Sequence, residues 1–145
     1  MYEVYGEMEM QGAGGQCLTG REALERMRSQ VLLVQRLREQ IRELSVDGVH
    51  CLRTDSVGGG SRSMNRGLDM RLEKKDALER MLRRESQRMR EYEQEARRWM
   101  DAMKPELYAF CLMYYIGGYG MLETSETMDR SVRQCERYKE EIGRL

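Results

Sequence analysis

The chain has 145 residues, 25 basic and 25 acidic side chains, and a formal net charge of zero. Charged residues make up 34% and aromatic residues 7%, a composition typical of long solvated helices and not of a β-sandwich or barrel. The four cysteines are too far apart for a zinc site, and the one histidine has no partner group for catalysis. We therefore predict an all-α protein that is not an enzyme and needs no metal or other cofactor.

The N-terminal segment predicts neither structure nor targeting. Residues 1–18 are rich in Gly, Met and Glu without periodicity, so we expect them to be disordered. The first ten residues are acidic, unlike a signal peptide, and no apolar run approaches the ~20 residues of a membrane span. We expect a cytoplasmic protein with free thiols and no membrane partner.

A first long helix is predicted from residue 19 to about residue 45. Thr19 and Glu22 fit a capping box, in which hydroxyl and carboxylate satisfy the backbone donors of a helix start. Apolar residues then recur every three or four positions and share one face. They are Leu24, Met27, Val31, Val34, Leu37, Ile41 and Leu44.

The next segment, about residues 46–66, is predicted to be a flexible connection. Gly58, Gly59 and Gly60 stand in a row within it, with Ser and Asn around them and no periodicity. The glycines lack the Lys-Ser or Lys-Thr of a phosphate-binding loop and follow no strand, so they are interpreted as a linker.

A second, longer helix is predicted from about Leu68 to Met103. Its stripe has a heptad rhythm, interrupted by three polar residues, Arg71, Lys75 and Glu85. Trp99 is expected to be a buried core anchor. The apolar members of the stripe are Leu78, Leu82, Met89, Tyr92, Ala96, Trp99 and Met103.

Residues 19–103 thus predict a long antiparallel helical hairpin. Because the second helix is the longer one, its end from Tyr92 to Met103 should pack against the C-terminal domain or a second chain. We favour a homodimer through residues 67–103, while packing within one chain is the alternative. A cluster of basic residues is expected near the hairpin turn. We interpret it as a surface that keeps the protein soluble, and a phosphate-binding site is the alternative. Its members are Arg62, Arg66, Arg71, Lys74 and Lys75.

Residues 104–145 form a second predicted domain. Pro105 ends the long helix and suits the first turn of a new one. The strongly apolar run that follows, up to Gly117, should provide the floor on which two later helices sit. The floor residues are Leu107, Phe110, Cys111, Tyr114 and Tyr115.

The last 25 residues predict a helix-turn-helix. One helix covers residues 121–128, a turn follows at Asp129 and Arg130, and the last helix, capped by Ser131, covers residues 131–143. In the first of these helices Met121, Thr124, Ser125 and Met128 should face inward, and in the last helix Cys135, Tyr138 and Ile142 should do so.

The outward face of the last helix carries the predicted DNA contacts. Arginine can bind guanine with two hydrogen bonds, and glutamine can bind adenine in the same way, so Arg133, Gln134 and Arg137 are candidates for base contacts. Arg130 and Lys139 are placed for phosphates. The alternative is an ordinary solvated face, in which these cations alternate with Glu136, Glu140 and Glu141.

Three runs in this region resemble a known family: P-E-L at 105–107, Y-Y-I-G-G at 114–118 and D-R-S-V-R-Q-C-E-R-Y-K-E at 129–140. The segment from Pro105 to Leu145 is similar to sigma-factor region four, and more closely to small phage proteins related to late-gene transcription activators of Gram-positive phages. That resemblance implies double-stranded DNA as ligand, host RNA polymerase as a candidate partner and a bacterial host cell. It also implies which residues of the recognition helix would face the groove: Val132, Arg133, Gln134, Glu136 and Arg137.

The predicted function is therefore a phage or prophage transcription regulator that reads duplex DNA. Its predicted DNA-binding residues are Arg130, Ser131, Val132, Arg133, Gln134, Glu136, Arg137 and Lys139. One alternative is a DNA-packaging factor such as a small terminase subunit, in which similar helices assemble into a ring. Another is a coiled-coil scaffold whose C-terminal domain binds protein.

Overall fold

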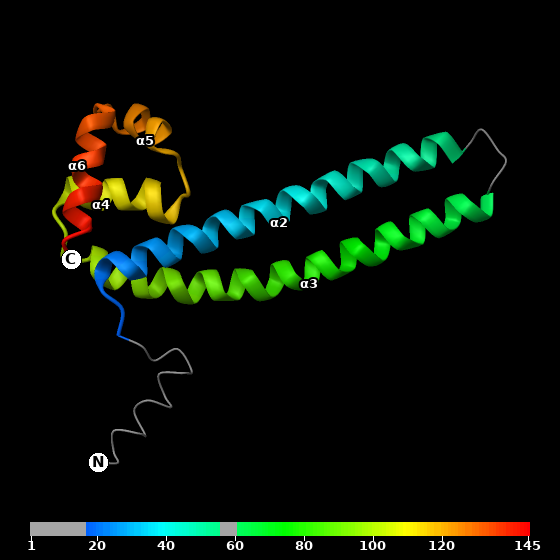
Figure 1. Ribbon diagram of the computed structural model, residues 1–145, viewed down its shortest axis with the longest axis horizontal. Coiled ribbons are helices and arrows are strands. Elements are labelled where there is room, and N and C mark those ends of the chain that lie inside the picture. Colours follow the sequence, from blue (N-terminus) through cyan, green and yellow to red (C-terminus); the bar gives the residue numbers. More distant parts are fainter. Residues whose placement is uncertain (1–16, 56–60) are drawn as a thin grey trace, which may run out of the picture.

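A computed structural model describes the backbone of residues 17–55 and 61–145, and the side chains of residues 17–45 and 67–145. Two long helices, α2 (Gly20–Asp55) and α3 (Ser61–Met100), lie side by side as an antiparallel hairpin (Figure 1). The later helices gather at the end of the hairpin where α2 begins and α3 ends (Figure 1). The all-α prediction is confirmed: within the described ranges every regular element is a helix.

The start of α2 is the predicted capping box. The backbone N of Glu22 donates to the Thr19 hydroxyl over 3.1 Å, and the backbone N of Thr19 donates to the Glu22 carboxylate over 3.0 Å. Both hydrogen bonds satisfy backbone N–H groups that have no partner inside the helix. The prediction of disorder over residues 1–18 falls mainly on residues 1–16, which lie outside the described residues.

The predicted flexible connection over residues 46–66 is wrong in its bounds. α2 continues to Asp55, and α3 already begins at Ser61. The apolar period ends near residue 45, but the chain from there to residue 55 contains no proline and only one glycine, Gly48. A single glycine costs a helix about 1 kcal/mol relative to alanine, which a paired helix tolerates. The three-glycine run itself, residues 58–60, lies outside the described residues.

The two helices of the hairpin are close in length, with 36 residues in α2 and 40 in α3. At 1.5 Å per residue they span about 54 and about 60 Å. The long unmatched stretch that led us to expect a second chain is therefore absent. Instead, Ala96 and Met100 at the end of α3 are buried in the same core as the C-terminal helices.

Trp99 corrects another expectation, because it is 36% exposed and not a buried anchor. Its ring lies over the first residue of α2: a Cβ added to Gly20 would stand 2.8 Å from the Trp99 Cε3 atom. The neighbouring Met100 is fully buried. The heptad pattern thus predicted burial of Trp99, whereas the adjacent Met100 is the buried residue. Glycine at position 20 leaves space for the Trp99 ring.

A buried polar pair crosses the seam of the hairpin. The Gln30 side-chain amide donates to the Glu85 carboxylate over 2.8 Å and to the Glu85 backbone carbonyl over 2.9 Å. Both residues are buried, Gln30 at 8% and Glu85 at 7% exposed. Because an unpaired polar group here would cost free energy, this pair fixes the register of α2 against α3. Glu85, which interrupts the apolar stripe in the sequence, is thereby satisfied.

One core joins the hairpin to the C-terminal helices. After α3 the chain forms α4 (Pro105–Cys111), which continues into the π-helical segment η2 (Leu112–Ile116). The five predicted floor residues, Leu107, Phe110, Cys111, Tyr114 and Tyr115, are all buried. They pack with Leu24, Met27 and Val31 of α2, with Ala96 and Met100 of α3, and with three residues of the last helix, Cys135, Tyr138 and Ile142. The residues before and after the predicted boundary at residue 104 therefore belong to different helices but share one hydrophobic core.

No helix within the described ranges is both long enough and apolar enough to cross a membrane.

Candidate nucleic-acid interface

The predicted helix-turn-helix is present as two helices with a tight turn. α5 (Met121–Met128) ends at Asp129, which has the left-handed backbone conformation with φ 57°. Asp is one of the few residues besides glycine that adopt this conformation readily. The backbone N of Arg130 then donates to the Ser125 carbonyl over 3.0 Å, which satisfies the open end of the helix. The turn therefore falls where the sequence predicts it.

Ser131 starts the last helix, α6 (Val132–Ile142), as predicted. Its hydroxyl accepts a hydrogen bond from the backbone N of Gln134 over 3.1 Å. A hydroxyl used in this way supports the helix start, at about 1 kcal/mol for a typical cap. Ser131 thus has a defined structural role at the exposed N-terminal end of α6.

Small buried side chains let α5 and α6 pack closely. Thr124 and Ser125 face inward as predicted, and their hydroxyls are satisfied within α5, at the carbonyls of Gly120 (2.8 Å) and Leu122 (2.9 Å). The predicted inner stripe of α6 is buried as well. Its Tyr138 ring packs on Phe110 of α4, with ring centroids 5.8 Å apart. The core therefore turns the opposite face of α6 to solvent.

Two arginines dominate that outward face. Arg133 and Arg137 are exposed, lie one helical turn apart and form no ion pair among the described residues. Val132, at the first turn, is 36% exposed, and Gln134 is half-buried. Glu136 and Glu140 are exposed on the same side, so the face combines two free cations with two carboxylates.

The two cations predicted to hold phosphates make contacts within the protein. Arg130 forms an ion pair with Glu106 of α4 over 3.2 Å, and this hydrogen bond raises the pKa of its guanidinium above the ordinary value. Lys139 places its ammonium 5.5 Å from the centre of the Tyr114 ring. Both side chains are exposed, so these contacts hold them in place without removing them from solvent.

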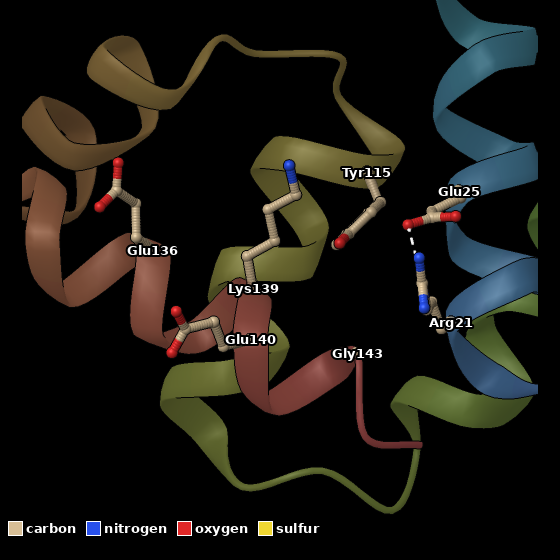
Figure 2. A pocket seen from close by; sticks show the side chains of 7 residues that line it. All are labelled: Arg21, Glu25, Tyr115, Glu136, Lys139, Glu140 and Gly143. Carbon is tan, nitrogen blue, oxygen red and sulfur yellow. Dashed lines mark hydrogen bonds and ion pairs between the residues drawn. The ribbon is translucent and has the colours of Figure 1, made fainter.

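A cavity of about 360 Å³ separates α6 from α2. Figure 2 shows Lys139 on the α6 side, the Arg21–Glu25 ion pair of α2 (3.2 Å) on the other side, and Tyr115 between them with its hydroxyl turned toward α6. Burial raises the pKa of Tyr115 above its ordinary value, so its hydroxyl stays protonated at neutral pH. Glu136 and Glu140 line the same cavity. Two predicted DNA contacts, Glu136 and Lys139, therefore border this cavity as well as the outer face.

The sequence did not predict the contact that fixes these helices on the hairpin. The Arg28 guanidinium of α2 lies 3.8 Å from the centre of the Tyr114 ring and donates to the backbone carbonyls of Tyr114 and Tyr119, the latter over 2.8 Å. Gly118 packs against α2 with φ 75°, and an added Cβ would stand 2.9 Å from Val31 Cγ1. The only sequence signal is an arginine between Leu24 and Val31 on an apolar face.

The thiols of the core are not reactive groups. Burial raises the pKa of Cys111 to about 12 and also raises that of Cys135, so both stay protonated at neutral pH. Across the described part of the chain, no three His, Cys, Asp or Glu side chains come together in a way that could hold a metal ion.

Comparisons of the chain with protein-family models, with curated proteins and with solved structures find no match.

Proposed function

We propose that the protein is a DNA-binding transcription regulator of a phage or prophage, sigma-like, which reads duplex DNA with α6. The observation that carries the proposal is the arrangement of α5 and α6: a tight turn, a capped helix start and a second helix whose outward face presents Arg133 and Arg137 without ion-pair partners in the described chain. In helix-turn-helix proteins the N-terminal part of the second helix contacts base edges in the major groove.

Each of the exposed residues has a chemistry suited to this role. Arg133 and Arg137 can each form two hydrogen bonds to a guanine, and Val132 offers an apolar contact for a thymine methyl group. Arg130, held by Glu106, and Lys139, above Tyr114, stand at the edges where the phosphate backbone would pass. Gln134, which is half-buried, would need a side-chain rotation to reach a base.

A binding selection tests the proposal. Labelled duplexes from the gene neighbourhood of the protein are compared with shuffled duplexes of the same composition at moderate salt. We expect a preference for particular fragments, and expect Arg133→Ala and Arg137→Ala each to lose roughly 1–3 kcal/mol of that discrimination. Arg144→Ala is the matched control, because Arg144 is an exposed arginine just beyond α6. Equal affinity for native and shuffled duplexes would contradict the proposal.

Two partners belong to the same proposal. Late-gene activation implies contact with host RNA polymerase, which a pull-down with purified polymerase core tests. A homodimer through residues 67–103 would pair two readers on one operator. The excess helix length no longer supports that dimer, but Met70 and Leu72, on different faces of α3, are 63% and 52% exposed, so each leaves apolar surface in solvent. Light scattering decides between a dimer and the ring of a packaging factor.

A further inference from the structure

The charge of α3 is concentrated in one short stretch. Residues 80–90 hold five basic side chains and one acidic one, a net charge of +4. The stretch before it, residues 67–79, has three basic and four acidic side chains, and residues 91–98 have two basic and three acidic, so each has a net charge of −1. We call the exposed arginines of residues 80–90 the arginine band; they are Arg80, Arg83, Arg84, Arg88 and Arg90.

The band has no exposed acid within it. Its only carboxylate, Glu85, is 7% exposed, lies in the seam and accepts from Gln30. Arg84 and Arg88 reach the edge of that carboxylate at 3.6 and 3.5 Å, while their side chains remain 62% and 55% exposed. The hydrogen bond from Gln30 lowers the pKa of Glu85 the most, and the nearby charges of Arg88 and Arg84 lower it further.

In the flanking stretch each arginine has an acidic partner on the same helix. There Arg97 pairs with Glu93 over 2.8 Å, and Arg98 pairs with Glu95 over 2.9 Å. In the band, by contrast, Arg80 and Arg83 form no ion pair among the described residues, and Arg90 donates to the neutral amide of Gln87 over 2.7 Å. Like charges this close repel one another, because the screening length is about 8–10 Å at physiological salt. A solubilising surface does not require that arrangement.

Three members of the arginine band form one outward row together with Gln87. Arg80, Arg83, Gln87 and Arg90 follow the helical spacing that puts residues on one face, opposite the seam residues Leu82 and Glu85. From the first to the last is ten residues, or about 15 Å along the axis. That length corresponds to about four base-pair steps of a duplex.

From these observations we infer that the arginine band is a second DNA-binding surface, which contacts the phosphate backbone of a duplex without reading its sequence. Guanidinium and amide groups are the side chains that hold phosphate and sugar. An acidic protein partner fits less well, because protein interfaces have an apolar core. In the band the only large hydrophobic side chain that is exposed is Met81, at 37%.

The inference takes duplex DNA as the ligand from the proposed function but does not depend on α6 reading bases. It is tested by the salt dependence of binding to a labelled duplex, measured by fluorescence anisotropy from about 50 to about 200 mM salt. The test variant is R80Q/R83Q/R90Q. The control is R38Q/R42Q/R98Q, which removes three exposed arginines outside the band.

We expect the slope of log affinity against log salt to fall by about two to three in the test variant, because each lost phosphate contact contributes about 0.9. The control should keep the wild-type slope. R83Q alone should lower it by about one, which keeps the test decisive if the triple variant folds poorly. Equal slopes in test and control variants would overturn the inference. Unchanged duplex binding with lost binding to poly-glutamate would overturn it in favour of an acidic protein partner.

The R133A/R137A variant separates this inference from the proposed function. If it keeps the wild-type preference among duplexes while the band variant lowers the salt slope, the proposed reading by α6 fails and the band stands. If R133A/R137A loses the preference while the band variant behaves as its control, the reading by α6 stands and the inference about the arginine band fails. A wild-type protein that binds no duplex at the lowest salt contradicts both.

Discussion

The hairpin has two halves that differ in what covers them. The half near the C-terminal helices is buried on two sides, and its side chains share the core with α4, η2 and α6. In the other half, residues 38–45 of α2 and 67–84 of α3, every described side chain is half-buried or exposed. The far half differs in two ways: Arg71 and Lys75 interrupt its apolar stripe, and no third layer covers it. The apolar period therefore does not by itself determine how much a helix pair buries.

The largest effect should separate two matched leucines. Leu24→Ala removes a fully buried side chain near the C-terminal helices and should lower the free energy of unfolding by about 3–5 kcal/mol. Leu78→Ala removes a half-buried one from the other half and should cost about 1 kcal/mol. Chemical denaturation of both variants measures the difference. Equal losses would mean that the two halves are equally stabilised.

A second variant removes the contact that brings the third layer to the hairpin. Arg28→Ala leaves the carbonyls of Tyr114 and Tyr119 without their donor and uncovers the Tyr114 ring, so we expect a loss of about 1–3 kcal/mol in the free energy of unfolding. Arg36→Ala is the control, because Arg36 is exposed on the same helix. If the two variants unfold alike, Arg28 does not hold the layers together.

The Gln30–Glu85 pair should make stability depend on acid pH. The pKa of Glu85 is lowered in the folded protein, mainly by the Gln30 hydrogen bond, so its contribution is present above the ordinary carboxyl pKa, about 4.3, and is lost as pH falls through the folded value. Glu85→Gln should lower the free energy of unfolding at neutral pH by about 1 kcal/mol. The gap to wild type should shrink below about pH 4. A gap that is constant with pH would show that the charge of Glu85 contributes nothing.

The smallest effect is expected at the distal half. Met70→Lys and Leu72→Lys alter exposed side chains and should change the free energy of unfolding of the monomer by less than about 0.5 kcal/mol. Their effect on mass is the informative readout: light scattering should show a loss of self-association if the proposed homodimer uses this stretch. A wild-type dimer that both variants preserve would place the dimer contact elsewhere.

Local signals made the helix starts and the turn before α6 predictable. Thr19 and Ser131 carry hydroxyls of the kind that cap the start of a helix. Asp129 stands between two segments with helical apolar spacing, which indicates a turn. These interactions join residues three to five apart, so one short stretch of the sequence contains both partners. The bounds of α5 and the start of α6 therefore follow from the sequence.

Long-range contacts were not predictable in the same way. The pattern shows Glu85 as an interruption, but nothing in it names Gln30, which is 55 residues away. Likewise Arg28 binds carbonyls 86 and 91 residues away, and backbone carbonyls have no sequence signature. The extension of α2 to Asp55 was not predictable either, because it runs past the end of the apolar period and past Gly48.

The contacts of Arg28 and Gly118 have a mechanical consequence. The Arg28 side chain joins α2 to the Tyr119 carbonyl, and Gly118 packs directly against α2. The segment that leads into α5 therefore has no free hinge relative to the hairpin. The hairpin, about 60 Å long, is therefore joined without a hinge to the C-terminal helices. A rotation of those helices by a few degrees would displace the far end of the hairpin by several ångströms.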